Sequence, residues 1–293
     1  MEQILAYLRE QNLPESLIRD VKGFRAAYPV EERVQRRVGA PQMHFFGSDI
    51  LQMAVAGILA GENILAENLA WIFGRPVYNV SFHVNTDSST LIGTDTFRDN
   101  EVTLRKGPVY QCAAYGGFGI LDEINMAKND AVAVLHATLD YRRIIDVPGY
   151  EKIDLHPATR FIGTMNYGYA GTKELNEALV SRFLVIYMPA LTEETLSQIF
   201  HSAFPQLKKE AEKQFAGLFL DLQKKADNSE ISTKAIDLRG MLAALKLIRG
   251  GLKPSLAVAM GITNKNFDLF EREMVEDIVR TRISESWSAS EVF

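Results

Sequence analysis

Hydrophobic and polar positions alternate with two different periods along the middle of the chain. Four apolar runs have the length and composition of buried strands, at residues 76–82, 117–121, 160–165 and 184–188. Between them, residues 129–140 place Val132, Leu135 and Leu139 on one face of a helix. Strands that alternate with helices predict an α/β fold, in which helices cover both faces of a parallel sheet.

The flanking regions follow other patterns. Residues 1–30 show helical spacing with a break near Pro14. Residues 144–155 form two short alternating arms around a Pro-Gly pair, which predicts a β-hairpin. After Pro189 the strand patterns stop, and four helices are expected at residues 192–204, 207–226, 234–248 and 266–283. We therefore expect an N-terminal helical segment (1–44), an α/β core (45–190) and a helical domain (191–293).

Composition indicates a globular protein. The chain has 293 residues, 47% of them hydrophobic, and a formal net charge of -5, which argues against a general electrostatic grip on nucleic acid. The longest apolar stretch, 50–59, is too short to span a bilayer, and residues 1–10 lack the apolar core of a signal peptide. The single cysteine, Cys112, cannot form an internal disulfide. We expect it to be a buried hydrophobe in a reducing, cytoplasmic compartment.

Two adjacent carboxylates, Asp122 and Glu123, come at the end of the second apolar run. The carboxyl ends of parallel strands form the usual ligand crevice of such sheets. There, one carboxylate can hold Mg²⁺ while its neighbour orients or deprotonates a water molecule. The alternative is structural: the pair accepts hydrogen bonds from the first amides of the helix that Asn125 and Met126 begin.

Three more polar residues stand near the ends of expected elements. Asn166 follows the third apolar run, so its amide is expected beside the carboxylates; the alternative is a turn asparagine before Gly168. Arg182 precedes the fourth run, where it offers a guanidinium to a neighbouring subunit's phosphate or forms a surface salt bridge. Arg239 lies near the start of a C-terminal helix, where it folds over a nucleotide or is simply solvated.

The joint order of these residues resembles that of an AAA+ ATPase, most closely the MoxR-like, dynein-related branch. The stretches that carry the resemblance are GRPVYNVSFHVNTDSSTLIGT (74–94), KGPVYQCAAYGGFGILDEINMA (106–127), RFIGTMN and ELNEALVSRF. By this resemblance Asp122 and Glu123 form the Walker B element, and Asp122 is the Mg²⁺ ligand. The resemblance also implies that Asn166 is sensor 1, Arg182 the arginine finger and Arg239 sensor 2.

The family resemblance carries wider expectations. It implies a parallel-sheet AAA+ core followed by a smaller helical lid, with ATP and Mg²⁺ as cofactors. It also implies self-association into a ring, typically a hexamer, that acts in a chaperone-like way. Its client in this family is often a protein with a von Willebrand A domain.

The phosphate loop that such proteins carry is not in this sequence. No stretch reads G-x-x-x-x-G-K-[ST], and the segment 61–65, the expected start of the first core strand, runs directly into a helix body at Ala66. The stretch 168–173 has glycines and a lysine but the wrong spacing. Because the backbone amides and lysine of that loop cradle the phosphates, we expect ATP affinity to be lower by orders of magnitude.

Two conformations are open for the junction left by the missing loop. One long helix over residues 49–73 is favoured by six apolar residues that recur at spacings of three or four, apart from one gap at Glu62: Leu51, Val55, Ile58, Leu65, Leu69 and Ile72. The alternative keeps a stub strand at 63–65. We favour the helix.

Three hypotheses for function follow. The first is an ATPase that remodels or matures a partner protein and whose written sequence has lost its loop. The second is a non-hydrolysing scaffold on the same fold. The third is a component of a nucleic-acid-directed machine, which the acidic balance of the chain counts against.

Overall fold

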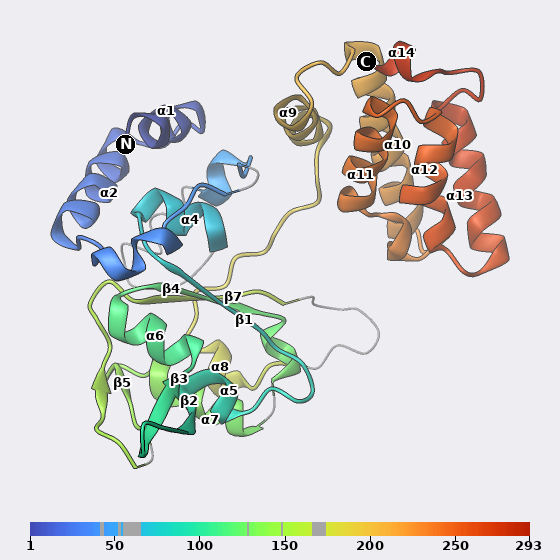
Figure 1. Ribbon diagram of the computed structural model, residues 1–293. Coiled ribbons are helices and arrows are strands. Elements are labelled where there is room, and N and C mark those ends of the chain that lie inside the picture. The colour runs from blue at the N-terminus through green and yellow to red at the C-terminus, as the bar shows by residue number, and fades with distance from the viewer. Residues whose placement is uncertain (42–43, 52–53, 55–65, 128, 148, 166–173) are drawn as a thin grey trace. The chain divides into compact units, whose positions relative to one another are not determined.

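The chain folds into two compact units. This computed structural model describes residues 1–41, 44–51, 54, 66–127, 129–147, 149–165 and 174–293. Unit 1 comprises Met1–Met188 and unit 2 comprises Pro189–Phe293 (Figure 1).

A parallel sheet forms the centre of unit 1. Its described strands are β1 (Val77–Ser81), β4 (Phe118–Asp122) and β7 (Arg160–Gly163), in the order β1-β4-β7. Both pairs are parallel, and the register sets Ser81 opposite Asp122 and Leu121 opposite Gly163. Three of the four predicted strands are thereby confirmed, and their carboxyl ends share one edge.

Unit 1 has helices within the predicted ranges 1–30 and 129–140, and further helical elements outside them. They are α1 (Glu2–Glu10), α2 (Glu15–Ala27), the 3₁₀ turn η1 (Glu32–Arg37), α4 (Ala66–Phe73), α5 (Ser88–Ile92), α6 (Pro108–Tyr115), the 3₁₀ turn η2 (Ile124–Met126), α7 (Asn129–Leu139) and α8 (Glu177–Val180). Side-chain caps start two of them, because Asp87 accepts from the Thr90 amide and Asn176 from the Ala178 amide. Residues 48–51 and 54 are also helical, whereas the junction at 55–65 lies outside the described residues.

Helices cover the sheet on both faces, as predicted (Figure 1). Side chains of α1, α2 and α4 pack with Phe118 and Ile162 in one cluster. Side chains of α5, α6 and α7 pack with Leu121 and Phe161 in the other. Neighbouring residues of one strand therefore serve opposite clusters, which is the period of two that a strand imposes.

The fourth predicted strand, 184–188, is wrong: this segment is irregular. Ile186 packs against the cluster that α1, α2 and α4 form, but its neighbours Leu184, Val185 and Tyr187 are exposed. A strand needs a partner for its backbone groups, and no strand of the described residues pairs with this segment. The apolar composition of 184–188 suggested a buried strand, but a buried strand needs a neighbouring strand to pair with, and none of the described strands pairs with this segment.

Two hairpins extend from the sheet. The predicted one is confirmed as β5 (Ile144–Ile145) paired antiparallel with β6 (Ile153–Asp154). The other, β2 (Gly93–Arg98) with β3 (Glu101–Lys106), was not predicted. Its two-residue turn places Asp99 and Asn100 in the left-handed region, the geometry that Asn and Asp favour in tight hairpins. Tyr150 donates a hydrogen bond of 2.7 Å to Asp95, which links the two hairpins.

A buried arginine connects the carboxyl end of α2 with the carboxyl end of α6. Arg75 is 1% exposed and donates to the carbonyls of Tyr28, Tyr115 and Gly116, at the ends of α2 and α6. Burial lowers the pKa of its guanidinium. A cation at helix carboxyl ends satisfies carbonyls that have no partner within the helix. This contact explains why a fully buried charge is tolerated.

Unit 2 consists of helices. Its elements are α9 (Glu193–Ala203), α10 (Lys209–Asp227), the 3₁₀ turn η3 (Thr233–Ala235), α11 (Leu238–Arg249), α12 (Pro254–Gly261), the 3₁₀ turn η4 (Thr263–Lys265), α13 (Leu269–Arg282) and α14 (Ala289–Val292). The four predicted helices are confirmed. Helix α12 was not predicted; its Pro254 occupies the first turn, where proline is favoured.

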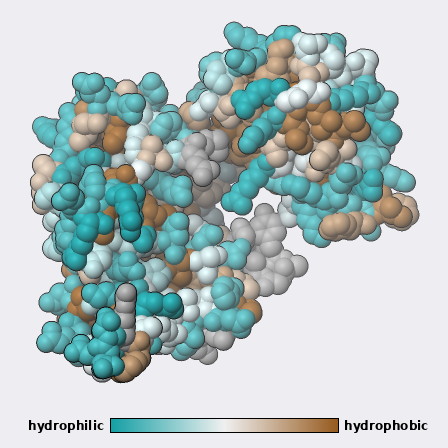
Figure 2. Space-filling view, viewed as in Figure 1, coloured by the Kyte–Doolittle hydropathy of each residue, from teal (hydrophilic) through white to brown (hydrophobic). Residues whose placement is uncertain are grey.

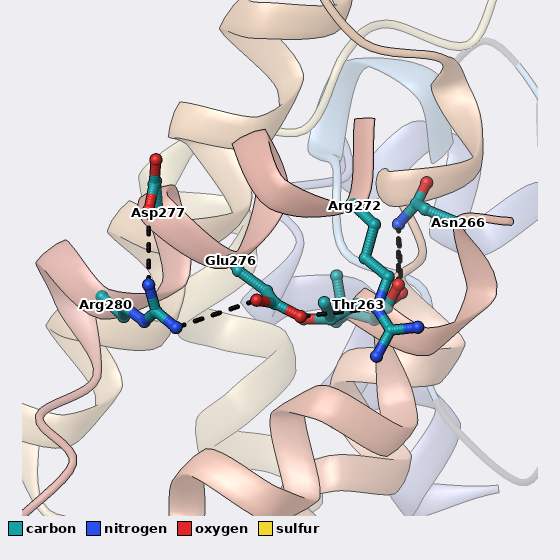
Figure 3. A network of polar contacts seen from close by, with 7 residues as sticks. Thr263, Asn266, Arg272, Glu276, Asp277 and Arg280 are labelled. Carbon is teal, nitrogen blue, oxygen red and sulfur yellow. Dashed lines mark hydrogen bonds and ion pairs between the residues drawn. The ribbon is translucent and has the colours of Figure 1, made fainter. Parts of the chain in front are cut away.

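The surface of unit 2 combines exposed charges with exposed apolar side chains. On α13, Glu276 lies 3.4 Å from Arg272 and 3.8 Å from Arg280 (Figure 3). Such solvated pairs each contribute about 0.5 kcal/mol or less. Hydrophobic residues also gather on the visible face of this unit (Figure 2). The exposed ones on α12, α13 and the segment between them include Leu256, Met260, Phe267, Leu269 and Phe270.

In the part of the chain that is described, no helix combines the length and apolar character needed to cross a membrane.

Candidate functional site

The predicted carboxylates lie at the carboxyl end of the central strand. The first four residues of β4 are buried, and Asp122 is the first exposed one. Its backbone is fixed on one side, because the Phe82 amide donates 2.8 Å to the Asp122 carbonyl. The strand thus delivers the Asp122 carboxylate to solvent from a backbone that is held in place.

Thr164, the residue after β7, forms several hydrogen bonds with this end of β4. Its amide donates to the Leu121 carbonyl at 2.9 Å, and its carbonyl accepts from the Ile124 amide at 3.0 Å. Its hydroxyl donates to the Asp122 carboxylate. Thr164 was not among the predicted site residues, although a signal was present: the third apolar run, 160–165, carries a hydroxyl residue near its end, at the edge where the carboxylates were expected.

Glu123 adopts an unusual backbone conformation. Its φ of 54° and ψ of 43° lie in the left-handed region, which residues with a side chain enter at a cost of roughly 1 kcal/mol. Its amide donates to the Thr164 hydroxyl at 3.4 Å. Within the described residues, its side chain makes no cap bond to η2, so the structural alternative, a carboxylate accepting helix amides, is not what Glu123 does. Strained backbone of this kind is concentrated at functional sites.

Arg182 lies in the same unit, just after α8. It is half-buried, and its guanidinium donates to the carbonyl of Ala178. Burial lowers the pKa of His136 on α7, and the nearby Arg182 charge lowers it further. The surface salt bridge considered for Arg182 is not formed with any carboxylate among the described residues.

The other predicted residues are placed differently. Asn166, the expected sensor 1, lies outside the described residues, as does the stretch 168–173. Arg239 belongs to unit 2, where it is exposed in the first turn of α11. Beside it, burial opposes ionisation of Asp237, but the Lys265 ammonium and the Gly240 and Arg239 amides outweigh it and lower the pKa of that carboxyl.

The donor set at the end of β4 fits a hard cation that is shared with a ligand. Mg²⁺ prefers oxygen ligands and usually binds one or two carboxylates together with substrate phosphates and water. The hydroxyl of Thr164 uses Oδ1 of Asp122, which leaves Oδ2 for a cation. Among the described residues, no group of three or more His, Cys, Asp or Glu side chains could enclose a metal by itself. The one free carboxylate oxygen fits a cation that completes its coordination with water or a bound ligand.

Comparison with known proteins gives matches that span this site. Residues 60–183 match the family described as AAA domain (dynein-related subfamily). The uncharacterized protein YojN of Bacillus subtilis (strain 168) is 28% identical over 291 residues, which cover 94% of this chain and 95% of that protein. The uncharacterized protein SAB1265c of Staphylococcus aureus (strain bovine RF122 / ET3-1) is 33% identical over 196 residues, covering 64% of this chain and 74% of that protein.

A solved structure is also similar. It is a putative ATPase from Cytophaga hutchinsonii, 16% identical, and the similarity covers 95% of this chain and 96% of that one at a TM-score of 0.37. A superposition this loose defines neither a site nor an activity. The family of this chain is therefore assigned from the match to the domain family and from the two bacterial relatives, and not from this structure.

Proposed function

The chain belongs to the dynein-related AAA domain family, and from this premise we propose that it is an AAA+ ATPase that remodels or matures a partner protein. The observation that carries this proposal is the exposed pair Asp122 and Glu123 at the end of a buried parallel strand, with Thr164 bonded to Asp122. The edge formed by the carboxyl ends of parallel strands is where α/β sheets bind their ligands.

Each residue has a role in this proposal. Asp122 holds Mg²⁺ through Oδ2, and the ion, when bound, neutralises charge on the phosphates of ATP. Glu123 orients the attacking water and accepts its proton. Asn166 contacts the same water or the γ-phosphate. Arg182 acts on a nucleotide held by a neighbouring subunit of a ring, proposed to be a hexamer, and Arg239 contacts the nucleotide from the lid.

The proposed activity is weak in this chain. The sequence has no G-x-x-x-x-G-K-[ST] stretch to supply the anion-binding amides and lysine. Losing one charge-assisted contact to a phosphate costs about 1.5–3 kcal/mol, and the missing loop supplies several. The chain is thus proposed to bind Mg-ATP in the millimolar range or more weakly, since each 1.4 kcal/mol is about tenfold in affinity.

The client and setting complete the proposal. The client is a protein, and one with a von Willebrand A domain is the first candidate. Exposed apolar side chains such as Phe267 and Phe270 on unit 2 support contact with another protein, because gathered apolar exposure is typical of interaction surfaces. The buried single cysteine and the acidic net charge support a cytoplasmic protein that works away from nucleic acid.

Turnover of Mg-ATP by this chain at millimolar nucleotide tests the proposal. We expect slow hydrolysis that the substitution Glu123→Gln abolishes, while Glu151→Gln, an exposed carboxylate on the β5–β6 turn, leaves it unchanged. Insertion of a phosphate loop between Asn63 and Ile64 is expected to raise affinity and rate together. Micromolar Mg-ATP binding by the present chain would contradict the weak-binding part of the proposal.

A scaffold without hydrolysis is the second candidate, and the missing loop motif favours it. It predicts that Glu123→Gln changes neither turnover nor nucleotide affinity, and that partner binding is independent of ATP. Equal, background-level hydrolysis by the wild type, the Glu123→Gln variant and the loop-restored protein would replace the ATPase proposal with this one.

A further inference from the structure

The hydroxyl of Thr164 makes two directed hydrogen bonds, one with the Asp122 carboxylate and one with the backbone amide of Glu123. It donates its proton to Oδ1 of Asp122 and accepts the amide proton of Glu123 at 3.4 Å. A threonine hydroxyl has one proton to donate, so the donor bond fixes its orientation and the amide bond uses one of its lone pairs. One side chain therefore contacts both members of the pair.

The backbone of Thr164 prevents this hydroxyl from moving away. Its amide and carbonyl are bonded to Leu121 and Ile124, on either side of the pair. The half-buried Thr164 is also β-branched, which restricts its χ1 angle. The position of the hydroxyl is thus determined by the pairing of β4 with β7 and by a stiff side chain.

The carboxylate that Thr164 contacts would otherwise be free to rotate. Asp122 is exposed, and an exposed aspartate samples several rotamers. With Oδ1 held by the hydroxyl, Oδ2 keeps a defined direction. The left-handed backbone at Glu123 is unfavourable for a residue with a side chain, and the bond from its amide to the hydroxyl offsets part of that cost.

We propose that Thr164 is a positioning residue, which fixes the Asp122 carboxylate for cation binding and supports the backbone conformation of Glu123. The metal-binding part of this inference rests on the proposed function. Thr164 acts through Asp122 and Glu123 and does not itself touch the reacting atoms.

Three variants isolate the hydroxyl. Thr164→Val keeps the branched shape and removes the hydroxyl, and Thr164→Ser keeps the hydroxyl. Thr159→Val is the matched control, because Thr159 immediately precedes the same strand at its other end and its buried hydroxyl donates to the carbonyls of Cys112 and Ala113. It removes a hydroxyl hydrogen bond next to β7 without touching the pair.

Two measurements on the intact chain decide the proposal. Mn²⁺ alone, titrated by electron paramagnetic resonance, reports the cation site at Asp122. Amide hydrogen exchange of Glu123, followed by NMR, reports the backbone. In Thr164→Val we expect Mn²⁺ affinity to fall about tenfold and the Glu123 amide to exchange about tenfold faster, as expected for loss of one hydrogen bond to a charged group. Thr164→Ser and Thr159→Val should stay within about twofold of the wild type in both measurements.

The two failures are distinguishable. Wild-type behaviour of Thr164→Val in both measurements, or behaviour of Thr164→Ser like that of Thr164→Val, overturns the positioning role. Wild-type Mn²⁺ binding no tighter than that of Asp122→Asn refutes the cation site of the proposed function. The exchange rate of the Glu123 amide still decides the positioning role in that case.

Discussion

Gly240 on α11 and Gly261 at the end of α12 face each other at a distance that excludes a side chain on either. A Cβ on Gly240 would lie 2.1 Å from the Gly261 carbonyl oxygen, and a Cβ on Gly261 would lie 2.4 Å from that of Gly240. Backbone, rather than a flexible side chain, is the obstacle in both directions. The packing of α11 on α12 therefore depends on this pair of glycines.

Gly240→Ala is expected to destabilise unit 2 by about 3 kcal/mol, since the two helices must separate to admit a methyl group. Urea unfolding followed by the fluorescence of Trp287, in a Trp71→Phe background, measures the free energy of this unit. The matched control is Gly23→Ala in α2, where nothing lies within 4 Å of the added Cβ. That change should stabilise unit 1 by about 0.5–1 kcal/mol, measured through Trp71 in a Trp287→Phe background. A Gly240→Ala midpoint equal to that of the wild type contradicts the packing argument.

Arg75→Met is expected to destabilise unit 1 by about 3 kcal/mol. The variant keeps much of the apolar stem but leaves the carbonyls of Tyr28, Tyr115 and Gly116 without their donor, and buried acceptors that lose a partner are costly. Arg9→Met, which breaks only the exposed pair with Glu15, should cost about 0.5 kcal/mol or less. Urea midpoints of the two variants give the comparison, and equal costs for both would refute the capping role of Arg75.

The pKa of His136 provides a pH test of the position of Arg182. Burial and then Arg182 lower this pKa below the ordinary value of 6.5, so the unfolded chain binds more protons than the folded one. The contribution to stability is therefore fully present above pH 6.5 and is lost as pH falls through the lower folded pKa. Arg182→Gln should raise the pKa of His136, measured by NMR of its ring protons, whereas Arg142→Gln should leave it unchanged. An unaltered His136 titration in Arg182→Gln would show that the two side chains do not interact.

The sequence predicted the three strands of the described sheet and most of the longer helices. Their apolar residues form either a continuous buried run or one face of a helix, and both patterns can be recognised locally. The run Phe118–Leu121 is buried throughout, and a fully buried strand reads as a continuous apolar run. The segment 184–188 has the same apolar character, yet pairing depends on a neighbouring strand that no local pattern specifies. The β2–β3 hairpin was missed although Asp99-Asn100 between alternating arms is a turn signal of known type.

The candidate site shows the same division. Asp122 and Glu123 were identified from their place after a strand, because strand ends in a parallel sheet share an edge. Thr164 was not identified, since its contact with Asp122 depends on the register of β4 against β7, where Leu121 faces Gly163. The left-handed backbone at Glu123 could not be predicted either. Such a backbone is usually recognised from a glycine in the sequence, and here the position holds a glutamate.

Glu123→Gly is expected to increase stability while it removes activity. Glycine enters the left-handed region without the steric cost of a Cβ, so we expect about 0.5–1 kcal/mol of added stability to urea in unit 1. Ser229→Gly is the matched control, because Ser229 has a φ of 60° after α10 and is remote in sequence from the carboxylates. Its stability gain should be similar, and hydrolysis should not change. In Glu123→Gly, hydrolysis above background should disappear because the group proposed to orient water is gone. A glycine variant that is less stable than the wild type would show that the glutamate side chain contributes more to folding than its backbone costs, and that Glu123 has a structural role.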